Sequence, residues 1–109
     1  MNLSLTALAD EHLELARQAS SGRSGYKLYG GRDHQMHLTM IALASGHLLD
    51  EHNNPGEALV QIVSGQVLVR GGGETLTGST GELLVVPDAP HSLEALEDSV
   101  IVLMTVNAG

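Results

Sequence analysis

The sequence contains no cysteine, no tryptophan and no phenylalanine, and Tyr26 and Tyr29 are its only Phe, Trp or Tyr residues. The lack of cysteine excludes thiol catalysis, cysteine-ligated zinc, iron–sulfur clusters and disulfide scaffolds. The scarcity of aromatic side chains removes the stacking platforms on which single-stranded nucleic acids bind. Any metal site must therefore use histidine and oxygen ligands, and the core must consist of aliphatic side chains and methionine.

Positive charge is also scarce. Five Lys and Arg face thirteen Asp and Glu, which gives a net charge of −8. Residues 1–35 hold four acids and four bases and are neutral, so the whole excess lies in residues 36–109, where nine acids face Arg70 alone. Such a charge disfavours the phosphate backbone, and we expect no nucleic-acid partner. The uneven distribution indicates different roles for the two parts of the chain.

Long apolar stretches are missing as well. No run approaches the roughly 18 apolar residues of a membrane-spanning helix, and the N-terminus lacks the basic and apolar stretches of a secretory leader. We therefore expect a cytoplasmic protein that does not associate with membranes. A length of 109 residues suits one small domain. An apolar content of 42% is typical of a folded chain.

The spacing of apolar residues predicts one helix followed by strands. From Leu5 to Ala19, apolar side chains recur at steps of three and four residues behind the N-cap candidate Ser4, which indicates an amphipathic helix. Residues 24–33 hold three glycines, and we expect an irregular or short extended segment there. Beyond residue 36, apolar runs between turn residues predict strands over 37–44, 58–64, 66–70, 74–76, 82–87, 92–96 and 99–106.

These strands follow one another without intervening helices, which predicts an all-β antiparallel barrel or sandwich. Val, Ile and Leu dominate them, as in strands that are buried on both faces. In so short a chain the outer face would need a second subunit, so we expect a homodimer. We divide the chain into residues 1–35, a helix and connecting segment that packs on the barrel or the partner, and residues 36–109, the barrel.

Two patterns of glycine, proline and histidine lie at ordered spacings. Residues 46–65 read G-x5-H-x-N-x3-A-x6-G, and residues 81–91 read G-x5-P-x3-H. They resemble the two motifs of the cupin superfamily (RmlC-like proteins), G-x5-H-x-H-x3-E-x6-G and G-x5-P-x-G-x2-H-x3-N. In this sequence the histidine of the second motif stands one residue closer to the proline than the motif has it. The resemblance covers about half of the chain. It implies a jelly-roll β-barrel of antiparallel strands, and it also implies a dimer.

The resemblance further implies where a metal would bind. In metal-binding cupins, the first motif supplies two His and a Glu, and the second supplies a His. His52 and His91 match the first and last of these ligands, whereas Asn54 stands at the second His position and Ala58 at the Glu position. Two of the four ligand positions therefore retain a ligating residue.

Two imidazoles alone rarely hold Zn, Fe, Ni or Mn, because catalytic sites normally use three protein ligands and an open position. We therefore predict no firmly held cofactor, with a divalent metal on His52 and His91 as the alternative. Asn54 or Glu57 would be a further ligand, although strand alternation turns Glu57 away from the face of Ala58. His37 would supply a third imidazole if its strand faces the lumen.

Three functions follow from this reading. The first is the binding of a small molecule in the barrel lumen without a firmly held metal, by His52, Asn54, His91 and His37. The second is a metal-dependent cupin enzyme of the dioxygenase or isomerase type that uses His52 and His91. The third is a sensing or structural dimeric module. In an enzyme, His52 or His91 would act as general acid or base, since imidazole titrates near neutral pH.

Overall fold

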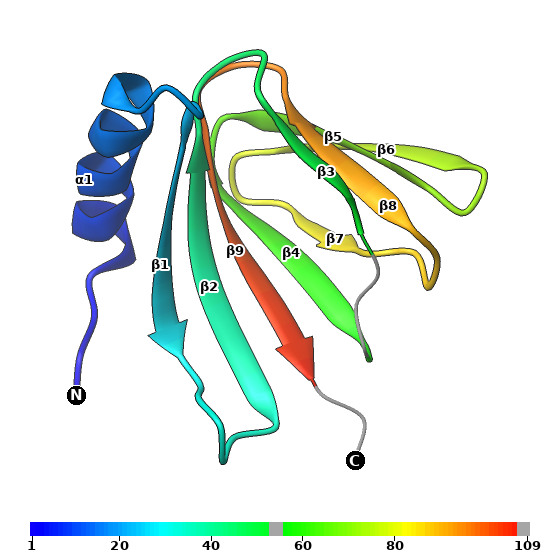
Figure 1. Ribbon diagram of the computed structural model, residues 1–109, viewed down its shortest axis with the longest axis horizontal. Coiled ribbons are helices and arrows are strands. Elements are labelled where there is room, and N and C mark those ends of the chain that lie inside the picture. Colours follow the sequence, from blue (N-terminus) through cyan, green and yellow to red (C-terminus); the bar gives the residue numbers. More distant parts are fainter. Residues whose placement is uncertain (53–55, 107–109) are drawn as a thin grey trace.

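The computed structural model of the protein describes residues 1–52 and 56–106. It consists of one helix and two antiparallel sheets that face each other (Figure 1). Sheet A has the strand order β1-β2-β9-β4-β7 and sheet B the order β3-β8-β5-β6. The elements are α1 (Leu5–Gln18), β1 (Arg23–Tyr29), β2 (Met36–Leu43), β3 (Leu48–His52), β4 (Ala58–Ser64), β5 (Gln66–Gly71), β6 (Glu74–Ser79), β7 (Leu83–Val85), β8 (His91–Ala95) and β9 (Ser99–Val106). This is a jelly-roll barrel, as the sequence predicts.

The helix α1 begins where the sequence predicts. The Ser4 side chain accepts a hydrogen bond from the backbone N–H of Ala7 at 3.2 Å, which satisfies one of the unpaired donors of the first turn. Ala9, His12 and Ala16 form its buried face against sheet A. His12 is held there by Ser24 of β1, whose Oγ lies 2.7 Å from its Nδ1, and its ring stacks on Tyr26. None of the described helices is long and apolar enough to cross a membrane.

Sheet A is apolar on both faces, which agrees with its continuous Val, Ile and Leu runs. Its central pair, β2 and β9, stays in register over eight residue pairs, from Met36↔Val106 to Leu43↔Ser99. One face packs against sheet B and forms the barrel core, with Leu43, Ala58, Val60, Ile62, Val67, Val69, Val86, Leu93, Ala95 and Ile101. The other face packs under α1 and forms the outer core, with Ala9, Ala16, Leu28, Met40, Ala42, Val100 and Val102.

Several strands differ from the sequence prediction. β6 continues to Ser79 instead of ending at residue 76, and β7 covers only Leu83–Val85 of the predicted 82–87. Two others differ more. The segment 24–33, expected to be irregular or a short strand, contributes the seven-residue β1, which is the edge strand of sheet A. Sheet A therefore begins before residue 36. The strand β3 was not predicted, because Asp50 and Glu51 interrupt its apolar pattern and its register shifts between Leu49 and His52.

The motif glycines have a conformational role. Gly46, Gly65 and Gly81 have φ angles of 85°, 95° and 86°, the left-handed region in which a side chain is strained. Gly65 also packs against Ser99, whose Oγ donates to the Gln66 carbonyl at 3.1 Å. These glycines therefore make the turns that end one strand and begin the next.

Candidate functional site

His91 is a buried polar residue of the barrel interior. It begins β8, and only 4% of its surface is exposed. Its Nδ1 lies 2.9 Å from the carbonyl oxygen of Ala89. Because a carbonyl oxygen only accepts hydrogen bonds, Nδ1 carries the proton, and in the neutral ring Nε2 is the basic nitrogen.

Gly71 fixes the position of His91 from the neighbouring strand. The two residues are paired across β5 and β8. A Cβ atom at position 71 would lie 2.7 Å from the Cβ of His91 and 2.8 Å from the carbonyl oxygen of Pro90. The close approach of these strands thus requires glycine at this position.

The cavity beside His91 is small and aliphatic. Its volume is about 20 Å³, which is room for about one water molecule. The sequence prediction placed a small organic molecule in this lumen, and the volume shows that such a molecule requires the walls to move. Apart from His91, the described residues that line it are Leu49, Val60, Val69, Val86, Leu93, Ile101 and Leu103.

The structure places the predicted partner of His91 on the adjacent strand. His52 of β3 is paired with His91 of β8 in the backbone register. The side chain of His52 and the whole of Asn54 lie outside the described residues, so the predicted contact between them and His91 stays a prediction.

Ala58 and Glu57 differ in burial. Ala58, at the position of the family's glutamate, is buried in the barrel core, where it presents a methyl group. Glu57, the residue before β4, is exposed and lines a larger hollow, which Ala58 also borders.

His37 does not line the cavity beside His91. Its position in β2, two residues from Thr39 and four from Ile41, turns it to the barrel side of sheet A. The Lys27 Nζ lies 3.3 Å from the Nδ1 of His37. Since an ammonium group only donates, Nδ1 accepts this hydrogen bond, and the proton of the neutral ring is on Nε2.

These donors do not fit a three-ligand metal site. No three His, Asp or Glu side chains of the described ranges, 1–52 and 56–106, lie close enough together to hold a metal ion. His91 is the only nitrogen or oxygen side chain among the described residues of its cavity, and the family's carboxylate is replaced by Ala58. We therefore derive no reaction step through a metal.

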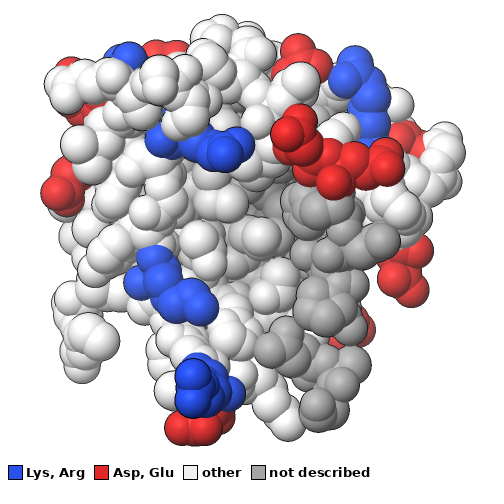
Figure 2. Space-filling model, viewed as in Figure 1, with Lys and Arg blue, Asp and Glu red and all other residues white. Residues whose placement is uncertain are grey.

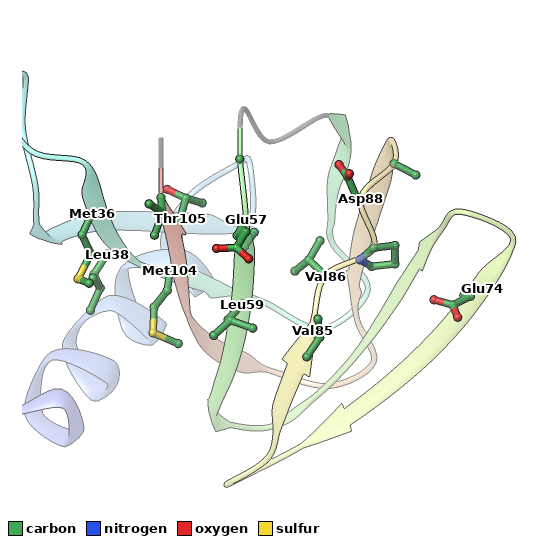
Figure 3. A pocket seen from close by; sticks show the side chains of 15 residues that line it. Met36, Leu38, Glu57, Leu59, Glu74, Val85, Val86, Asp88, Met104 and Thr105 are labelled. Atoms are coloured by element: carbon green, nitrogen blue, oxygen red, sulfur yellow. The ribbon is translucent and has the colours of Figure 1, made fainter. Parts of the chain in front are cut away.

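A much larger hollow, of about 1000 Å³, is lined by residues from both faces of sheet A, such as Leu59 and Ala58 of β4, and by the connection between β7 and β8. Met36 and Leu38 of β2, Leu59 of β4, Val85 of β7 and Met104 of β9 turn their side chains toward it (Figure 3). Acidic residues stand at its rim, namely Glu57, Glu74 and Asp88. No pattern in the sequence predicted this hollow, because the segments that line it are far apart in the chain and meet only in the folded sheets.

One ion pair joins the helix to the turns of the barrel. The carboxylate of Asp98 accepts from the backbone N–H of Ser45 at 2.8 Å and from the Arg17 Nε at 2.8 Å. These two hydrogen bonds, the Ser45 bond first, lower the pKa of Asp98 below its usual range. The carboxylate thereby links α1 to the β2–β3 and β8–β9 turns, away from the cavity.

Solved structures share this architecture. The chain superposes with a TM-score of 0.74 on a conserved protein of unknown function from Streptococcus pyogenes, at 26% identity over 84% of this chain and 79% of that one. It superposes at 0.72 on a cupin superfamily protein from Desulfitobacterium hafniense, at 15% identity over 79% of this chain and 78% of that one. It also superposes at 0.75 on a salicylate 1,2-dioxygenase from Pseudaminobacter salicylatoxidans, at 19% identity over 92% of this chain and 33% of that one.

These likenesses establish the fold. The chain has the jelly-roll fold that cupin superfamily proteins of known structure share. It spans about a third of the length of the dioxygenase. No protein-family model matches the sequence, and no curated protein matches it.

Proposed function

We propose that this cupin-fold domain binds a small, mainly apolar molecule in its barrel lumen, through one hydrogen bond to His91 and without a firmly held metal. The observation that supports the proposal is the setting of His91, a buried imidazole among seven aliphatic side chains of the described lumen. A pocket of apolar walls with one fixed polar group is typical of small-molecule sites. In this proposal the Ala89 carbonyl keeps Nδ1 protonated, and the ligand donates its hydrogen bond to Nε2.

The small cavity means that the barrel opens when the ligand enters. β3 is an edge strand of sheet B and β1 an edge strand of sheet A, and within the described residues no backbone pairing joins the two sheets along that side. Opening there displaces aliphatic side chains but breaks no sheet hydrogen bonds. Leu49 of β3 lines the cavity and is the side chain that such a movement carries outward.

A ligand screen by thermal unfolding tests this proposal. A compound present at 100 times its Kd stabilises the folded state by about 2.7 kcal/mol. Stabilisation that falls to about 1.4 kcal/mol in His91→Leu, as a ten-fold weaker affinity gives, and stays undiminished in His34→Ala supports a lumen site, because His34 is an exposed residue of the β1–β2 connection. Undiminished stabilisation in His91→Leu contradicts it.

A cavity variant makes the same test without knowledge of the natural ligand. Leu103→Ala removes three carbon atoms from the wall of the cavity. Enlarged aliphatic cavities bind benzene-sized probes, so we expect benzene or indole to stabilise this variant more than the wild type. Equal effects on both proteins would show that the lumen does not admit a ligand.

The alternative function is a metal-dependent enzyme that uses His52 and His91. It is supported by the likeness to a dioxygenase fold and by the backbone pairing of these two histidines. Metal analysis of protein purified without a chelating tag separates the two functions. Near-stoichiometric iron, zinc, nickel or manganese that is lost in His52→Ala would favour the enzyme.

A further inference from the structure

The hollow of about 1000 Å³ is a second cavity of the protein. It lies at the end of the barrel where β2 and β4 begin and β7 and β9 end, and it reaches Glu74 at the start of β6 (Figure 3). Its volume is at the upper end of the range for small-molecule sites. Val86 is the single residue of the described ranges that borders both this hollow and the cavity beside His91. The hollow is therefore a site distinct from the lumen.

The walls of the hollow are aliphatic side chains and methionine, contributed by Met36, Leu38, Leu59, Val85 and Met104. Met36 is 52% exposed and Val85 69%, so water covers surface that an apolar molecule would cover at a gain in free energy. Methionine side chains are flexible and adapt to apolar ligands of irregular shape. A ligand of the hollow should therefore have an apolar part.

The polar side chains of the hollow determine which polar group such a ligand carries. Among the described residues they are the carboxylates of Glu57, Glu74 and Asp88 and the hydroxyl of Thr105. Carboxylates accept hydrogen bonds and carry negative charge. No Lys, Arg or His stands beside them in the described lining. The polar group of the ligand should therefore be a donor with positive charge, whereas a carboxylate or phosphate would meet like charges.

No base of the described chain pairs with these three acids. The salt bridges found between residues 1–52 and 56–106 involve Arg17 and Arg70, and their carboxylate partners lie outside the hollow. The other three bases lie in β1 and in the connection that follows it, at the opposite edge of sheet A from β7. Figure 2 shows Lys and Arg mostly on the side of α1, β1 and β2. The negative charge of the hollow is thus left for a ligand to neutralise.

We propose that the hollow binds an amphipathic organic cation of the alkylammonium class. Its apolar chain lies on the methionine and leucine walls, and its protonated amine donates to the carboxylates of the rim. A protonated amine has three N–H donors and no acceptor, which complements a rim of acceptors. An uncharged amphipath satisfies only the walls, and an anionic one is repelled by the rim. This site does not depend on the lumen site, since His91 does not line it.

Three probes with the same eight-carbon chain test the choice of ligand, namely octylammonium, octanol and octanoate. Methyl NMR of the methionines reports where they bind. Met36 and Met104 line the hollow, whereas Met1 is fully exposed at the N-terminus and Met40 is fully buried. We expect saturable shifts of Met36 and Met104 with Met1 unchanged, and affinity that falls from octylammonium to octanol to octanoate. Equal affinity for the three probes, or equal shifts at Met1, would overturn the proposal.

Neutralising the rim tests the role of its charge. Glu57→Gln and Asp88→Asn should each weaken octylammonium binding about two- to five-fold at low salt, the effect of one exposed ion pair, and leave octanol binding unchanged. Glu11→Gln is the matched control, because Glu11 is an exposed acid of α1 and its substitution removes the same charge. An equal loss in Glu11→Gln would show that the net charge of the chain, and not the hollow, attracts the cation.

A wall variant and a lumen variant locate the bound chain. Val85→Ser should weaken the binding of both octylammonium and octanol. Leu48→Ser, at a residue of sheet B that is 48% exposed, should weaken neither. His91→Leu should bind octylammonium as the wild type does, whatever its effect on lumen ligands. Octylammonium binding that is lost in His91→Leu and kept in Val85→Ser would place the cation in the lumen and contradict the proposal.

Discussion

Gly71 and His91 face each other across β5 and β8 so closely that a Cβ atom at position 71 would lie 2.7 Å from the Cβ of His91. Gly71→Ala should therefore displace His91 and weaken its hydrogen bond to the Ala89 carbonyl. Overpacking of this kind costs about 1–3 kcal/mol of unfolding free energy. Urea unfolding measures the loss, and the NMR shifts of the ring nitrogens of His91 report the displacement.

Gly25→Ala is the matched control for that variant. Gly25 also lies in a strand, yet a Cβ atom there has no neighbour within 4 Å. Its substitution should leave the His91 signals unchanged and alter stability by only a few tenths of a kcal/mol. If Gly71→Ala left the His91 signals equally unchanged, Gly71 would have no part in positioning the ring.

Asp98 gives the protein a pH-dependent link between helix and barrel. Its pKa is lowered in the folded state, first by the Ser45 N–H and then by Arg17. The carboxylate therefore stabilises the fold above its unfolded pKa of about 3.9, and this contribution disappears as the pH falls through the lower folded pKa. Asp98→Asn should be less stable than the wild type at pH 6, and the two should converge near pH 2.

Chemical unfolding at a series of pH values measures this effect. Glu97→Gln, a change at the neighbouring exposed acid, serves as the control and should follow the wild type throughout. A difference between wild type and Asp98→Asn that stayed constant from pH 6 to pH 2 would show that the ionised carboxylate is not its cause.

The N-cap of α1 is a further point of stability. Ser4→Ala removes the side-chain acceptor of the Ala7 N–H and should cost about 1 kcal/mol, as measured for other N-caps. Thermal unfolding checks the value. Ser20→Ala, beyond the other end of the helix, should be nearly neutral, and an equal loss in both variants would mean that the cap contributes nothing specific.

Much of the fold is encoded in local sequence signals. The strand Ser99–Val106 was predicted with its observed ends, because an uninterrupted apolar run lies between turn residues. The motif glycines mark turns for a reason visible in the backbone, since Gly46, Gly65 and Gly81 all have positive φ. By contrast, β3 escaped prediction because Asp50 and Glu51 point to solvent in a strand at the edge of its sheet.

The candidate site was less predictable, since it depends on where side chains point after the sheets pack. The motif indicated His91, but the hydrogen bond of its Nδ1 to Ala89 and the aliphatic filling around it are tertiary features. His37 was expected as a possible third imidazole. Its contact with Lys27 arises from the pairing of β1 with β2, which the irregular appearance of residues 24–33 concealed.

Calorimetric titration of the best compound from the ligand screen, into the wild type and into His91→Leu, tests the proposed function most directly. We predict one binding site per chain in the wild type and an affinity about ten-fold lower in the variant, the effect of losing one hydrogen bond of about 1.4 kcal/mol. Equal affinity in both proteins would contradict the proposal that His91 holds the ligand in the lumen.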